Sequence, residues 1–97
     1  DYAEVEYVQM AAGVAYEGVL IAIDAYLERK EGLKYKKPQS IEEYRTRVTK
    51  QNKKLLPLLN EAYGTLYIIL HLHGVPSSRV MIKGLNSAKE IIEYIKD

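Results

Sequence analysis

Residues 5–27 read VEYVQMAAGVAYEGVLIAIDAYL, and this stretch decides the fold. Apolar residues recur in it at spacings of three or four, which is the period of an α-helix. They are Val5, Val8, Ala12, Tyr16, Val19, Ile23 and Leu27. No proline interrupts the pattern and Gly32 is a natural stop, so the sequence predicts a first helix over about residues 2–30.

A second helix is predicted to begin at Ser40, which forms a capping box with Glu43. It should end near residues 52–54, because Pro57 is tolerated only in a first turn or at a kink. Its apolar stripe is thin and consists of Ile41, Tyr44, Val48 and Leu55. Most of its other positions are polar, so we expect this helix to lie at the periphery.

Two more helices follow, the first over about residues 56–73 and the second from Ser77 or Ser78 to the end. Gly74 and Pro76 separate them, as a C-terminal cap and a stop. The predicted inner face of the earlier helix is Leu59, Ala62, Tyr63, Leu66, Leu70 and His73, and that of the later one is Met81, Leu85, Ala88, Ile92 and Ile95. The fold class predicted is therefore all-α: a four-helix antiparallel up-and-down bundle with a long first helix.

The composition restricts the functions that this chain can carry. Its 97 residues make a single domain over residues 1–97, with 47% hydrophobic and 28% charged residues. No cysteine is present, which excludes a disulfide, a thiol nucleophile and a cysteine zinc site. The GxGxxG, GxxxxGK[ST], HExxH and GxSxG motifs are also missing. We therefore expect a protein that is not an enzyme and that holds neither a cofactor nor a metal.

The longest apolar stretch, residues 14–27, is interrupted by Glu17 and Asp24. A bilayer span needs about 20 nearly uncharged residues. The N-terminus also lacks the basic region, short apolar run and cleavage site of a signal peptide. The sequence thus predicts a cytoplasmic protein without a membrane segment.

The first helix has a second apolar side. Small residues form one stripe on it, and three larger ones point roughly opposite the core stripe. The small residues are Ala11, Ala15, Gly18, Ala22 and Ala25, and the larger ones are Met10, Val14 and Ile21. Either the helix is central and covered by the second and fourth helices, or this side is a subunit interface. Because the second helix is too polar to cover much, we predict a two-fold homodimer. Its candidate contact residues are Met10, Val14, Gly18, Ile21 and Ala25.

Charge is segregated along the chain. Residues 29–54 contain ten basic and three acidic residues, a net +7, while the rest of the chain carries a net −6. A basic helix beside a basic loop can neutralise phosphates or bind an acidic partner. The candidate residues are Arg45, Arg47, Lys50, Lys53 and Lys54, and we expect Arg47 and Lys54 to be exposed. The alternative is a solvated outer surface that only keeps the protein soluble.

Nine tyrosines occur without a single Phe or Trp. Most are expected in the core, with hydroxyls that reach a polar partner or the rim. One side of the third predicted helix carries Asn60, Gly64, Tyr67 and His71. These residues either line a small cleft, with His71 as a proton donor or acceptor, or are simply packed.

Four stretches together resemble the HEPN class of small helical bundles. They are AYEGVLIAIDAYLERKEG, SIEEYRTRV, EAYGTLYIILHLHG and GLNSAKEIIEYI, at residues 15–32, 40–48, 61–74 and 84–95. The resemblance implies a bundle that pairs as a dimer, a nucleotidyltransferase-type protein partner and a nucleotide- or RNA-related setting. Ribonucleases of that class carry an Arg followed by His after four to six residues. No Arg of this chain is followed by His at that spacing, and Arg47 is followed by Asn52.

These observations predict a non-catalytic interaction module of the HEPN-like type that associates with itself. The alternative is an accessory domain that binds nucleic acid or nucleotide through the basic residues between positions 29 and 54. A hydrolase that uses His71 is the third hypothesis.

Overall fold

The computed structural model describes residues 2–96, and every regular element in that part of the chain is helical. In chain order the elements are α1 (Tyr2–Glu31), the short 3₁₀ turn η1 (Gly32–Lys34), α2 (Ile41–Gln51), α3 (Leu55–Ala62), its π-helical continuation η2 (Tyr63–Leu72) and α4 (Ser78–Ile95). The predicted all-α four-helix bundle with a long first helix is confirmed. The molecule is elongated, with extents of 47 × 21 × 19 Å.

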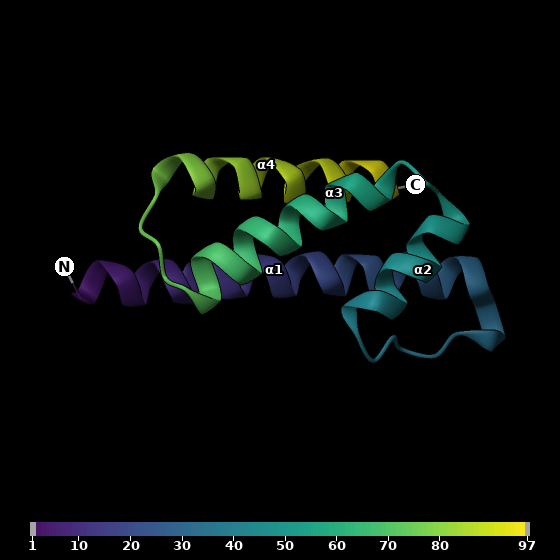
Figure 1. Cartoon of the computed structure of the whole chain (residues 1–97). Coiled ribbons are helices and arrows are strands. Elements are labelled where there is room, and N and C mark those ends of the chain that lie inside the picture. The colour runs from purple at the N-terminus through teal and green to yellow at the C-terminus, as the bar shows by residue number, and fades with distance from the viewer. Residues whose placement is uncertain (1, 97) are drawn as a thin grey trace.

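The helix α1 runs the whole length of the molecule (Figure 1). Helices α3 and η2 form one continuous rod that runs back in the opposite direction, and α4 then runs in the same direction as α1. The shorter α2 lies across the C-terminal half of α1 rather than along the full bundle. One end of the molecule is therefore built from α1, η1 and α2, and the other from α1, η2 and α4.

The predicted helix start at Ser40 and the predicted helix ends at Gly32 and Gly74 are confirmed, and local contacts explain them. The Ser40 hydroxyl accepts a hydrogen bond from the Glu43 N–H at 3.2 Å, and the Glu43 carboxylate accepts one from the Gln39 N–H at 3.2 Å. These bonds satisfy backbone donors that the first turn of α2 leaves free. Gly32 and Gly74 have φ of +62° and +65°, which is the left-handed conformation that ends many helices.

The core forms where the inner stripe of α1 meets η2, α4 and α2, and α3 closes it by packing on α4 and α2. Ala12, Val19, Ile23 and Leu27 are completely or almost completely buried, as the spacing predicted. Tyr16 and Tyr26 are the other buried apolar residues of α1. The remaining ones come from all the other helices: Tyr44, Val48, Leu55, Leu59, Ala62, Leu66, Leu70, Ala88, Ile91 and Ile95. The two buried residues of α2 are Tyr44 and Val48, which confirms its peripheral place.

The predicted inner face of α4 is confirmed for Ala88 and Ile95, which are buried, and is wrong for Leu85 and Ile92, because the helix is rotated about its axis. Leu85 and Ile92 were expected in the core, but they are 45% and 47% exposed. Gly84 and Ile91 point inward instead. A Cβ on Gly84 would lie 2.6 Å from the Thr65 hydroxyl, so α4 approaches η2 more closely than a larger side chain allows. This close contact fixes the rotation of α4.

The π-helical turns of η2 correct a second expectation. The His73 N–H bonds to the carbonyl of Ile68, five residues earlier, at 3.2 Å. Such turns are wider than α-helical ones and shift the later side chains around the axis. Leu66 and Leu70 remain buried, but His73 lies outside the core, contrary to the prediction.

Two stretches, Glu4–Lys34 and Leu55–Leu72, are long and apolar enough to cross a membrane by length and composition alone. A third of each is buried inside the bundle, and the core helices of many proteins meet the same criterion. The first stretch contains the acidic Asp24, which accepts a hydrogen bond from the Tyr44 hydroxyl of α2 at 2.8 Å.

Candidate functional site

The side of α1 that turns away from the core is apolar and uncovered. Tyr7, Met10, Val14 and Ile21 are 73%, 66%, 70% and 64% exposed. Gly18 lies between Val14 and Ile21, and Ala25 follows Ile21 by one turn; both are exposed as well, and a Cβ on Gly18 would meet nothing within 4 Å. We call these six residues the outer face of α1. Neither α2 nor α4 covers it, so α1 is not the central helix of the bundle.

An apolar groove continues this surface from α1 onto α4. Ala15 and Gly18 line its α1 side, and Leu85, Ala88 and Ile92 line its α4 side. Lys89 and Glu93 border the groove. The exposed Leu85 and Ile92 thus stand beside the outer face of α1. The sequence predicted them as core residues from their spacing of four and three. Apolar residues at the edge of a helix contact can have the same spacing as residues in the core.

Tyr7 is the member of the outer face that the sequence prediction missed. It lies seven residues before Val14, and a spacing of seven returns to nearly the same side of a helix. This spacing would have been enough to place Tyr7 on the same side of the helix as Val14 from the sequence.

Arg47, predicted to be exposed, is instead partly buried and held by a partner from α1. Its Nε donates to Glu31 Oε2 at 3.1 Å, and its Nη2 forms a second bond to Glu31 Oε1. The side chains of Arg47 and Glu31 are only 20% and 19% exposed, and the guanidinium stacks over Tyr35. This bidentate bond raises the pKa of Arg47. Arg47 therefore joins α2 to the end of α1 and is not a free phosphate ligand.

Two other arginines of the basic segment also have partners within the chain. The Arg45 Nε donates to Asn60 Oδ1 at 2.8 Å, and its guanidinium lies 5.2 Å from the centre of the Tyr63 ring. Arg29 donates to the carbonyl of Ile95, which connects α1 to the end of α4. Much of the basic charge that the sequence assigned to binding thus stabilises contacts between helices.

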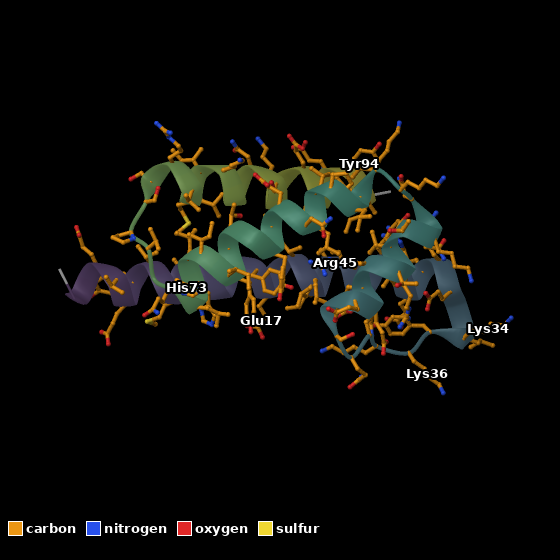
Figure 2. The ribbon with its side chains drawn as sticks, viewed as in Figure 1. Glu17, Lys34, Lys36, Arg45, His73 and Tyr94 are labelled. Carbon is orange, nitrogen blue, oxygen red and sulfur yellow. The ribbon has the colours of Figure 1, made fainter. Side chains whose placement is uncertain are left out.

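The lysines are the exposed cations of this region. Lys54 is exposed, as predicted, and so are Lys50 and Lys53. Lys34 and Lys36 extend away from the bundle at the end of α1 (Figure 2). An open hollow there, which we call the basic hollow, is lined by Lys30, Glu31, Leu33, Lys34, Lys36, Arg47, Lys50 and Gln51. Lys53 and Lys54 do not line it, so the structure separates the predicted set into two groups.

Aromatic rings form a row along η2 and α1. The ring centres of Tyr63 and Tyr67 are 5.4 Å apart, those of Tyr16 and Tyr67 are 5.2 Å apart, and those of Tyr67 and His71 are 5.8 Å apart. The wide turns of η2 bring residues four apart almost into line. This row accounts for several of the tyrosines as packing residues.

His71 is packed rather than free. Its Nδ1 lies 2.8 Å from the carbonyl oxygen of Gln9, which can only accept, so Nδ1 carries the hydrogen. A Cβ on Gly13 would lie 2.6 Å from this nitrogen, so the glycine makes room for the ring. Four residues were predicted to share one side of the third helix: Asn60, Gly64, Tyr67 and His71. The structure brings Tyr67 and His71 together, while Asn60, which lies in α3, binds Arg45.

Burial raises the pKa of two tyrosines, Tyr16 and Tyr44. Burial, with smaller effects of Tyr63 and Tyr67, raises the pKa of Tyr16 to about 12. Burial and the hydrogen bond to Asp24 raise the pKa of Tyr44 still further. Both hydroxyls therefore keep their protons to a higher pH than an exposed tyrosine, and that of Tyr44 donates to Asp24 Oδ1 at 2.8 Å.

The fold and these surfaces define a class: small all-α bundles with an uncovered apolar side and a lysine-rich end. The family described as a domain of unknown function (DUF5618) matches residues 1–97, so the chain belongs to that family. No curated protein and no solved structure is significantly similar to it.

Proposed function

We propose that this protein is a non-catalytic helical-bundle module that pairs with a second copy of itself through the outer face of α1. The observation that carries the proposal is the exposure of Tyr7, Met10, Val14 and Ile21, each more than 60% accessible on one side of one helix. A contiguous apolar patch of this kind commonly marks an interaction site.

The energy available from this surface is of the same order as the cost of association. Complete burial of one Val, Ile or Met side chain contributes about 1.5–3 kcal/mol. Met10, Val14 and Ile21 are each about two-thirds exposed, so burying them in both copies contributes roughly 6–12 kcal/mol. Association costs about 4–15 kcal/mol. Tyr7 and the rim of α4 add further apolar area.

The resemblance to HEPN bundles supports the same proposal, because bundles of that class pair as dimers. It also supports a role without catalysis, because the Arg and His pair of the ribonuclease members is missing. The packing of His71 against Gln9 and Tyr67 weighs against the third hypothesis, a hydrolase that uses His71.

Sedimentation equilibrium tests the proposal. The unmodified protein should be a dimer, and Val14→Glu should be monomeric with an unchanged helical circular dichroism spectrum, because two glutamates would lie in the apolar contact. Gly18→Leu should also dissociate the dimer without loosening the bundle, since nothing lies near Gly18 within one chain. The matched control is Leu33→Glu, an exposed apolar residue at the basic hollow, which should stay dimeric. A monomeric parent protein at high concentration would overturn the proposal.

A second candidate function is supported by the basic hollow. Five of the eight residues that line it are basic and one is acidic. Such a concentration of lysines suits a phosphate backbone, whose contacts weaken steeply with salt. The alternative proposal is therefore RNA binding through Lys34, Lys36 and Lys50. Arg45 and Arg47 are left out of it because they have partners within the chain.

The test is the affinity for a labelled single-stranded RNA at two salt concentrations. The double variant Lys34→Glu/Lys50→Glu should bind at least about tenfold more weakly, with a shallower salt dependence. Lys89→Glu/Lys96→Glu, which changes the same number of exposed lysines in the last turns of α4 and just after its end, is the control. If the parent protein binds no RNA at low salt, the lysines serve solubility only.

A further inference from the structure

We infer that the two copies pair with their α1 helices antiparallel, with the two-fold axis crossing α1 at the level of residue 16. This inference rests on the proposed self-association and specifies the geometry of the partner. Three features of the surface carry it: the sizes of the residues on the outer side of α1, the partial charges at the two ends of α1, and the position of the apolar rim of α4.

Residue size favours this register. In an antiparallel pair centred on residue 16, residues whose numbers add to 32 lie at the same level. Each level then combines one large and one small residue: Tyr7 with Ala25, Met10 with Ala22, Val14 with Gly18, and Ile21 with Ala11. Alternation of large and small residues lets the layers of a contact interdigitate.

A parallel pair would lack this complementarity. Each residue would then lie level with its own copy, so two large side chains would meet at Val14 and two small ones at Gly18. Bulky levels would hold the helices apart, and the small levels between them would leave voids, which cost stability.

The partial charges at the ends of α1 favour the same direction. A helix carries a partial positive charge at its N-terminus and a partial negative charge at its C-terminus. Antiparallel pairing places opposite ends of the two dipoles together, whereas parallel pairing would place like ends together. The exposed side chains add nothing to this preference, because Glu4 of one copy would lie level with Glu28 of the other.

The rim of α4 supplies the third argument. Leu85 and Ile92 line the groove beside Ala15 and Gly18, which is the level of the inferred axis. A two-fold axis perpendicular to α1 keeps both α4 helices on the same side of the α1 pair. The exposed Leu85 and Ile92 of the two copies then lie next to one another and become buried. With an axis along α1, the two α4 helices would lie on opposite sides and these residues would stay exposed.

Distances between spin labels test the inference, and the absence of native cysteine makes single labelling clean. A label at Glu28→Cys should be separated from its copy by about 36 Å along the helix in the antiparallel pair, at 1.5 Å per residue. In a parallel pair the same labels would be only about 10 Å apart, the distance between packed helices. A label at Glu17→Cys should be close to its copy in both arrangements.

The outcomes separate this inference from the proposed function. A short distance at position 17 with a long one at position 28 supports the antiparallel pair. Short distances at both positions overturn the antiparallel register while self-association stands. Long distances at both positions, or no intermolecular signal, overturn the inference and the proposed α1 contact together.

A second measurement uses the α4 rim. Leu85→Ala/Ile92→Ala should weaken the dimer at least about tenfold, because both side chains are half exposed in one chain and buried in the antiparallel pair. Leu72→Ala, a half-exposed leucine on η2 outside this surface, should leave the dimerisation constant unchanged. Equal dimerisation constants for the double variant and the parent protein would contradict the inferred position of α4.

Discussion

The two sides of α1 have similar compositions and different environments. The inner side, with Val19 and Ile23, is buried against the other helices, whereas the outer side, with Val14 and Ile21, is about two-thirds exposed. Both sides use the same residue types at the same helical spacing. The difference shows that apolar content alone does not decide which side of a helix enters the core; the helices that pack against it do.

The largest expected effect compares two isoleucines that lie two residues apart. Ile23→Ala should lower the free energy of unfolding by about 2–5 kcal/mol, because it leaves a cavity in the core. Ile21→Ala should change that free energy by less than about 0.5 kcal/mol, since the side chain is exposed in one chain. Urea unfolding in the monomeric Val14→Glu background measures both. Equal losses would mean that the outer side is covered within a single chain.

A smaller effect is expected for two glycines of α1. Gly13→Ala would place a Cβ 2.6 Å from the His71 ring, which the Gln9 carbonyl and Tyr67 hold in place. We expect a loss of about 1–3 kcal/mol from overpacking. Gly18→Ala meets nothing and should instead stabilise the single chain by about 0.5–1 kcal/mol through its higher helix propensity.

Thermal denaturation in the same monomeric background measures both glycine variants. A gain in stability for Gly13→Ala would show that His71 moves freely and that its packed position is not required.

The smallest effect at neutral pH compares Tyr16→Phe with Tyr7→Phe. The folded-state pKa of Tyr16, about 12, lies above the ordinary value of 10.0. The stability that its buried neutral hydroxyl contributes is therefore complete below pH 10 and is lost as the pH rises from 10 through about 12.

Urea midpoints at increasing alkaline pH provide the measurement. The parent protein and Tyr7→Phe should lose stability steeply over this range, and Tyr16→Phe should lose it less steeply. Identical slopes for all three proteins would show that the Tyr16 hydroxyl is not buried in the folded protein.

The basic segment, residues 29–54, shows that a sequence pattern does not reveal which charged side chains are free to bind a ligand. The sequence shows the excess of positive charge between residues 29 and 54, and Lys54 is exposed as predicted. It could not show that Arg47 binds Glu31, because the two residues are 16 positions apart and belong to different helices. A charge count cannot distinguish a binding residue from one that is already neutralised by a partner.

The sequence by itself determined the four helices, the caps at Ser40 and Gly74, and the inner stripe of α1. Those features depend on residues within one or two turns of each other, so the local pattern contains the information. Only the tertiary structure decided that Gly84 and Ile91 of α4 point inward while Leu85 and Ile92 stay on the rim, and that no helix covers Val14 and Ile21. The physical reason is that a helical period fixes which residues share a side, but the rotation of that side depends on how closely a neighbouring helix can approach.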